Sequence, residues 1–176
     1  MKIKKYEWSD IMEKLHQLTI NTLKERGVTI ESIAEIVYDL QKDYTDNLTI
    51  EYCQETILSV LKKREVIYAI LVGIALDKGA EQGLFTKEIN EVILDDNSLF
   101  GIDEILALSI INVYGSIALT NFGYVDKIKP FIIGKLNRLG EQKKQCTTFL
   151  DDLVAAIAAA SASKMAHDRL KKEDNV

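Results

Sequence analysis

Three acidic motifs in the second half of the chain contain the residues best suited to chemistry. They are Asp103-Glu104, the run Asp126-Lys127-Ile128-Lys129-Pro130, and Asp151-Asp152. Each lies beside or inside a stretch of apolar and small residues, where an ionised carboxylate is costly unless it is paired, hydrogen-bonded or bound to a cation. If the motifs meet in the folded chain, five carboxylates and one lysine form a natural site for a hard divalent cation and a phosphate group.

Each motif also has a simpler explanation. Adjacent acids in the first turn of a helix complement the helix dipole by about 0.3–1 kcal/mol. Thr148 and Asp151 fit a capping box at the start of the last helix. Asp126 and Lys129 fit a surface ion pair that contributes less than about 1 kcal/mol. The dipole accounts for one acid of each adjacent pair better than for both, because neighbouring carboxylates repel each other.

The proline after Lys129 predicts where this lysine lies. Proline is favoured at the first helical position, and the residue before it avoids the helical region. We therefore expect a helix over 130–139 with Lys129 at its start, where free amides and a lysine favour an anion such as phosphate. All three acidic motifs would then lie at helix amino ends that converge on one site.

The order DE, D-x-x-K-P, DD resembles the phosphatidylglycerophosphatase A family, whose members use magnesium to remove a phosphate from a lipid head group. The resemblance covers about residues 100–163. Lipid-acting members carry membrane-spanning segments and a glycine-rich stretch before the double aspartate, whereas this chain has Lys143-Lys144-Gln145-Cys146-Thr147-Thr148 there. The resemblance is therefore to a soluble branch, acting on a phosphorylated lipid or a small phosphomonoester.

The resemblance also implies a role for each residue of the motifs. The metal ligands would be Asp103, Glu104, Asp126 and Asp152, and the catalytic residues Asp126, Lys129 and Asp151. Mg²⁺ suits these ligands because it prefers oxygen and keeps waters that a substrate can displace. Lys129 would neutralise charge on the transferring oxygens. The nucleophile stays open between a metal-activated water and an aspartate such as Asp151, which would form a phosphoenzyme.

The segments that must position these motifs have helical spacing, and no segment shows sustained strand alternation. We expect an all-α fold, a single compact multi-helix bundle over residues 1–176. The expected helices begin near Ser9, Thr29, Thr49, Arg64, Thr86, Ile102, Pro130 and Thr148. Whether a break separates the helices on either side of residue 63 stays open.

One uncharged stretch, residues 105–125, is about as long as a membrane-spanning helix requires. Its six polar side chains would be poorly satisfied in lipid, so a buried central helix explains it better. We expect 105–122 to be the most buried segment. The small Ala and Ser side chains at 155–163 would let neighbouring helices pack closely beside Asp151-Asp152.

Composition limits the class of protein. A chain of 176 residues with 47% hydrophobic types can bury one sizeable core. A net charge of −5 with scattered lysines and arginines argues against nucleic-acid binding. Cys53 and Cys146 lie far apart and are expected to be reduced thiols of a cytoplasmic protein, and the amino terminus lacks the apolar region of a signal peptide.

Two kinds of contact and one rival function stay open. We expect at most peripheral membrane contact, through Lys2, Lys4, Lys5 and the helix at Trp8, and a homo-oligomer that uses the stretch 66–76. The rival function is a non-catalytic helical interaction or regulatory module with a retained acidic metal-binding site. A phosphatase assay with and without Mg²⁺ distinguishes the two functions.

Overall fold

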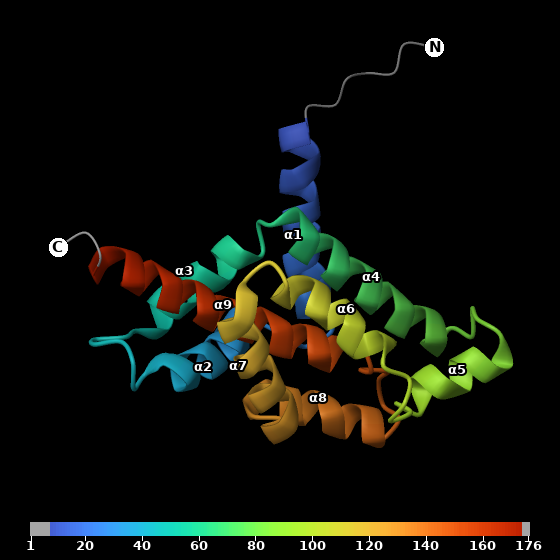
Figure 1. Ribbon diagram of the computed structural model, residues 1–176. Coiled ribbons are helices and arrows are strands. Elements are labelled where there is room, and N and C mark those ends of the chain that lie inside the picture. Colours follow the sequence, from blue (N-terminus) through green and yellow to red (C-terminus); the bar gives the residue numbers. More distant parts are fainter. Residues whose placement is uncertain (1–7, 174–176) are drawn as a thin grey trace, which may run out of the picture.

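The structure of the protein is a computed structural model that describes residues 8–173. Over this range the chain is all-α, as predicted, with nine helices and no strand (Figure 1). The helices are α1 Trp8–Glu25, α2 Ile30–Gln41, α3 Ile50–Val60, α4 Arg64–Glu81, α5 Lys87–Leu94, α6 Ile102–Ile111, α7 Gly115–Ile128, α8 Phe131–Glu141 and α9 Leu150–Glu173. Lys2, Lys4 and Lys5, expected to contact membranes, lie outside the described residues.

Local capping signals set several helix starts. Thr29 precedes α2, where its side chain accepts a hydrogen bond from the Ser32 amide in a capping box. Thr49 precedes α3 and accepts from the Tyr52 amide. These bonds satisfy amides that have no partner inside the helix. A break at residues 61–63 separates α3 from α4, which answers the question that the sequence left open.

The buried central helix of the bundle is α9, and the expectation that 105–122 is the most buried segment is wrong. Residues 150–163 are all buried. Helices α2, α3, α4, α6, α7 and α8 pack against α9, which runs through the middle of the bundle (Figure 1). The small side chains of its Ala/Ser stretch allow this close approach from several sides.

The uncharged stretch forms two helices, α6 and α7, instead of one. Residues 112–114 separate them, and Gly115 opens α7 with a φ of 78°, a left-handed conformation that favours glycine. Each helix covers α9 with one face and leaves the other face in solvent, so Ile105 and Leu119 are 63% and 52% exposed. No described helix, α6 and α7 included, is long and apolar enough to cross a membrane.

The stretch proposed for association is largely part of the core. Val66, Ile70 and Ile74 of α4 are buried, whereas Tyr68 and Val72 remain exposed on its outer side. Nothing in the structure tests a homo-oligomer, which stays a prediction.

Candidate active site

The three acidic motifs meet at one end of α9, but not in the way that the sequence predicted. Asp103 and Asp151 do lie in the first turns of α6 and α9. Asp126, in contrast, lies in the last turn of α7, and Lys129 is the C-cap of that helix. Pro130 is the N-cap of α8 rather than its first residue. The amino ends of α6 and α9 therefore meet the carboxyl end of α7, and α8 begins two residues after Lys129, as expected. The expectation that all three acidic motifs lie at helix starts is wrong for Asp126.

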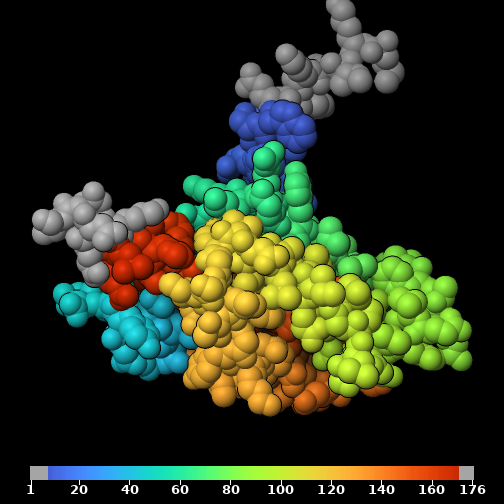
Figure 2. Space-filling view, viewed as in Figure 1, coloured from blue at the N-terminus to red at the C-terminus, as the bar shows by residue number. Residues whose placement is uncertain are grey.

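A cavity of about 280 Å³ lies where these helix ends meet. It is lined by Asp96, Asn97, Ser98, Asp103, Glu104, Asp126, Lys129, Asp151 and Asp152. All six residues singled out from the sequence are among them. In Figure 2, α6 in yellow and α7 in amber cover the front of the molecule, and the orange-red start of α9 is visible beside them through an opening.

Lys129 is the only lysine or arginine among the residues that line this cavity. Its Nζ donates hydrogen bonds to Asp126 Oδ1 at 2.7 Å and to Asp151 Oδ2 at 3.0 Å. Asp152 Oδ1 lies 3.8 Å from the same nitrogen. Burial by itself would lower the pKa of Lys129, but the neighbouring carboxylates outweigh it and raise the pKa above the ordinary value. The ammonium group is therefore charged at any physiological pH.

Three carboxylates of the cavity lie close enough together that they could hold a metal ion. One oxygen from each of Asp103, Glu104 and Asp152 lies within 4.8 Å of the other two. Asp103 is buried, and its Oδ1 has no hydrogen-bond partner among the described residues. A buried carboxylate oxygen without a partner is costly, and a cation beside it would remove that cost. The donor set is all oxygen, which fits Mg²⁺.

The pKa values describe the same crowding of negative charge. Burial, followed by the neighbouring Asp151 charge, raises the pKa of Asp152 to about 9. Burial and a hydrogen bond with Glu104 raise the pKa of Asp103 to about 7. Burial also raises the pKa of Asp151, but Lys129 opposes the shift and holds it at about 6. A divalent cation would therefore displace protons when it binds.

Asp77 of α4, which the sequence did not single out, holds the start of α9 in place. Its two carboxylate oxygens accept hydrogen bonds from the amides of Phe149 and Leu150, each at 3.1 Å. Asp77 is fully buried, and burial raises its pKa to about 7 although these hydrogen bonds oppose the shift. The capping box predicted from Thr148 is wrong, because the Thr148 hydroxyl donates to the Ile93 carbonyl at 2.6 Å instead.

An unusual backbone turn presents Lys129 to the cavity. Lys129 has φ 50° and ψ 54°, a left-handed conformation that costs free energy for a residue with a side chain. Phe131, on the other side of Pro130, is also left-handed at φ 49°. A Cβ placed on Gly134 would lie 2.5 Å from the Lys129 carbonyl oxygen. Glycine at 134 therefore lets α8 pass close against this turn.

The loop between α5 and α6 contributes three cavity residues that the sequence reasoning missed. Asp96, Asn97 and Ser98 all line the cavity, and Asp96 has a left-handed φ of 48°. Burial raises the pKa of Asp96, and Lys129 opposes the shift. The available signal was the polar run Asp95-Asp96-Asn97-Ser98 immediately before the first acidic motif.

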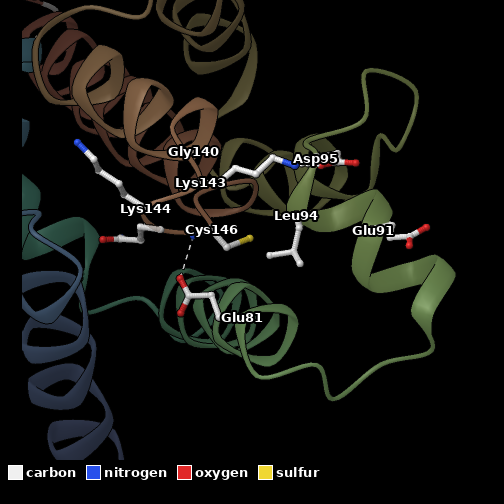
Figure 3. Close-up of a pocket in the computed structure, with 9 residues that line it drawn as sticks. Glu81, Glu91, Leu94, Asp95, Gly140, Lys143, Lys144 and Cys146 are labelled. Atoms are coloured by element: carbon white, nitrogen blue, oxygen red, sulfur yellow. Dashed lines mark hydrogen bonds and ion pairs between the residues drawn. The ribbon is translucent and has the colours of Figure 1, made fainter.

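A larger cavity, of about 650 Å³, lies between α4, α5 and the segment after α8 (Figure 3). Its most buried groups are already paired with each other. Glu81 accepts from the Cys146 amide at 2.9 Å and from Arg26 at 2.8 Å. Cys146 and Cys53 are both free and buried. The smaller acidic cavity, which combines converging carboxylates, one of them with a buried oxygen that has no partner among the described residues, with a lysine, is therefore the better candidate site.

Comparison with known families gives one match that covers most of the chain. The model of the family described as phosphatidylglycerophosphatase A matches residues 19–167. This range includes all of the residues that line the acidic cavity.

Similar proteins are known from several bacteria. The uncharacterized protein YpjQ of Bacillus subtilis (strain 168) is 48% identical over 98% of this chain and 93% of its own length. The crystal structure of YpjQ matches the present structure with a TM-score of 0.85, over 91% of this chain and 98% of the YpjQ chain. The uncharacterized protein YutG of the same organism is 50% identical over 82% of this chain and 86% of its own length. The crystal structure of a low temperature requirement C protein from Listeria monocytogenes has a TM-score of 0.84 at 49% identity, covering 88% and 96% of the two chains.

Proposed function

The chain belongs to the phosphatidylglycerophosphatase A family, and on this premise we propose that it is a Mg²⁺-dependent phosphomonoesterase. Its substrate would be a phosphate ester of a lipid head group or of a related small molecule. The observation that carries the proposal is the juxtaposition of Lys129 with two groups of carboxylates in one cavity. Such a site can bind a divalent cation and a phosphate together.

The residues divide into two sets by their surroundings. Asp103, Glu104 and Asp152 would hold the metal, because their oxygens converge and one of them has no other partner. Asp126 lies outside this group and accepts from Lys129, so a role in orienting the lysine fits it better than direct ligation. When bound, Mg²⁺ would neutralise phosphate oxygens and make a water molecule more nucleophilic.

The Lys129 ammonium group would bind the phosphate and stabilise charge on the transferring oxygens. Asp126 and Asp151 hold it from two sides, which fixes its position before the substrate arrives. Asp151 is poorly placed as a nucleophile, since Oδ2 accepts from Lys129 and Oδ1 accepts from the Asp152 amide at 3.0 Å. These contacts favour attack by water over a phosphoenzyme at Asp151.

The decisive experiment is a phosphatase assay on the purified protein with Mg²⁺ or with EDTA. The substrates are phosphatidylglycerophosphate dispersed in detergent and a set of small phosphomonoesters. We expect activity that requires Mg²⁺ and is lost in Asp152→Asn. Asp39→Asn is the matched control, because Asp39 is a half-exposed aspartate of α2 that pairs with Lys42. If no substrate is hydrolysed but Mg²⁺ still binds, the protein is the non-catalytic metal-binding module instead.

A further inference from the structure

Helix α1 is only partly packed into the bundle. Its buried residues, His16, Thr19 and Leu23, all lie in the second half of the helix, which packs mainly against α4. The first turns project beyond the rest of the bundle (Figure 1, Figure 2), and Trp8 is 69% exposed. Most of the stability of a helix comes from packing an apolar face against a neighbour. Within residues 8–173, part of α1 lacks such a neighbour.

An apolar stripe runs along α1 beside its buried face. Trp8, Ile11, Leu15 and Leu18 follow a spacing of three, four and three residues. This alternation is typical of helices that pair side by side through one apolar seam. Leu18 is 50% exposed, and Ile11 and Leu15 are half-buried. The stripe therefore fits a further helix that the bundle of one chain does not supply.

Helix α4 continues the same surface. Tyr68, Val72 and Ala75 lie on its outer side and are exposed, and they follow a spacing of four and three residues. The Tyr68 hydroxyl donates to the Met12 sulfur at 3.9 Å, so the stripes of α4 and α1 adjoin each other. We call the combined surface the α1–α4 face; it consists of Ile11, Leu15, Leu18, Tyr68, Val72 and Ala75.

The α1–α4 face is about as large as a stable protein–protein interface requires. Each of the two helices has 18 residues, and a helix of this length is about 27 Å long. Two helices packed side by side are about 20 Å wide. The face therefore covers roughly 500 Å² in projection, and its accessible surface is larger because side chains protrude. A standard interface buries about 800 Å² of accessible surface on each partner.

The charges around the face indicate which partner fits it. Lys14 lies one helical turn before Leu18, and Arg64 and Glu65 lie one turn before Tyr68. These three charged side chains are exposed, and none forms an ion pair within residues 8–173.

Further along the same two helices, an exposed ion pair joins Glu25 of α1 to Lys78 of α4 at 3.1 Å. The face is thus bordered by both signs of charge. An anionic membrane or a nucleic acid is matched by cations alone. A second copy of the face presents the same apolar stripes and both signs of charge. In a two-fold symmetric pair, residue i of one copy meets residue j of the other, so cations can meet acids.

We propose that two copies of this chain associate through the α1–α4 face, with their helices antiparallel around a two-fold axis. Each copy would contribute α1 and α4 to a four-helix arrangement, in which the projecting turns of α1 lie against the partner. The face contributes no residue to the acidic cavity, so this proposal does not depend on the proposed phosphatase function.

Sedimentation equilibrium of the full chain tests the proposal with two variants of opposite charge. The acidic variant is Leu18→Glu/Val72→Glu, and the basic variant is Leu18→Lys/Val72→Lys. Both positions are about half exposed, at 50% and 51%, so the substitutions leave the core of the chain intact. Leu119→Glu is the matched control, because Leu119 on α7 is 52% exposed. Circular dichroism checks folding, and Leu18→Gln/Val72→Gln replaces a charged variant that does not fold.

We expect the wild-type protein to be a dimer. Each charged variant alone should dimerise about 100-fold more weakly or worse, because like charges would face each other in a desolvated interface. An equimolar mixture of the acidic and basic variants should dimerise again, since every contact between the substituted positions then joins opposite charges. The control should stay within about 2-fold of the wild type.

A wild-type protein that is still monomeric at about 100 µM would overturn the proposal. So would charged variants that dimerise as the wild type does, or an equal loss in the control. A mixture that remains monomeric would overturn the symmetric arrangement. A monomeric wild type that floats with phosphatidylcholine–phosphatidylglycerol vesicles, and loses this binding in Leu18→Gln/Val72→Gln, would assign the face to a membrane instead. Hydrolysis and Mg²⁺ binding test the proposed function alone.

Discussion

The Nζ atom of Lys129 lies 3.0 Å from Oδ2 of Asp151 and joins the carboxyl end of α7 to the first turn of α9. The two side chains differ greatly in exposure, since that of Asp151 is 5% exposed and that of Lys129 is 31% exposed. The negative charge of the buried Asp151 carboxylate is therefore stabilised by the Lys129 ammonium group, which is exposed enough to contact a substrate. A phosphate entering the cavity would meet a lysine that is already held in position.

Lys129→Ala should therefore impair phosphate handling much more than metal binding. We expect phosphatase activity to fall by about 100-fold or more, because charge on the transferring oxygens would lose its partner. Mg²⁺ affinity, measured by calorimetry, should be unchanged or higher, since a positive charge 3.8 Å from Asp152 has been removed. Lys164→Ala, which breaks a comparable pair with Asp168 on α9, is the control. Strongly weakened Mg²⁺ binding in Lys129→Ala would contradict this division of roles.

Asp152→Asn should abolish activity while stabilising the metal-free protein. Asparagine removes one of the converging carboxylates, and with it the cost of burying a charge and of placing it beside Asp151, the two causes that raise the pKa of Asp152. At about pH 8 the free energy of unfolding in EDTA should rise by roughly 1 kcal/mol or more. Urea unfolding with and without Mg²⁺ measures this, and the wild-type gain on adding Mg²⁺ should be lost. A destabilised metal-free variant would argue against crowded negative charge at this site.

The raised carboxyl pKa values predict how stability depends on pH. Asp152 and Asp103 have folded pKa values of about 9 and about 7, against an unfolded value of about 3.8. Between these values the folded state binds more protons than the unfolded state, so the free energy of unfolding falls as pH rises. In EDTA, Tm should therefore decrease between about pH 5 and pH 9.

Mg²⁺ should have the opposite pH dependence. Its carboxylate ligands must lose their protons, so its affinity and the Tm increase that it causes should both grow over the same range. In Asp152→Asn the fall of Tm in EDTA should be shallower than in the wild type. A metal-free Tm that rises steadily toward pH 9 would contradict the assignment of protonated carboxyls in the empty cavity.

Asp77→Asn tests whether capping of α9 positions the metal ligands. The amide group offers one acceptor where the carboxylate offers two, so an amide of Phe149 or Leu150 would lose its partner, at a cost of about 1–3 kcal/mol. Mg²⁺ affinity should fall by about 10–100-fold, as it does when groups that orient metal ligands are removed. Glu81→Gln, one helical turn away, is the control, since the hydrogen bonds of Glu81 within the described residues go to Arg26 and the Cys146 amide and to no amide of α9. Normal Mg²⁺ affinity in folded Asp77→Asn would leave Asp77 a purely structural role.

Gly134→Ala tests whether the turn at Lys129 requires α8 to lie close against it at Gly134. Alanine normally stabilises a helix relative to glycine by up to about 1 kcal/mol. Here its Cβ would lie 2.5 Å from the Lys129 carbonyl oxygen, so the turn must shift and we expect a loss of about 1–3 kcal/mol together with lower activity. Gly123→Ala on α7 is the control, because its Cβ would meet nothing within 4 Å. Equal stabilisation by both substitutions would contradict the close approach.

Much of this architecture follows from local signals in the sequence. Helical periodicity gives the all-α class, and Thr29 and Thr49 place helix starts to within a residue, because a cap acts through amides of the next turn. The acidic motifs and their order also gave the family resemblance, which the match over residues 19–167 confirms. These signals act within one or two turns of the chain and need no information about the fold.

Other features depend on which helices face each other. Asp126 lies at the end of α7 rather than at the start of a helix, because α7 continues to Ile128 and Lys129 closes it. The central position of α9 depends on six neighbouring helices, and its small side chains are compatible with both a surface and a core. Asp77 caps Phe149 from 72 positions away along the chain. The sequence thus determined the helices and the acidic motifs, whereas tertiary packing decided which helix is buried and how the motifs meet, because burial and long-range hydrogen bonds exist only once distant segments are in contact.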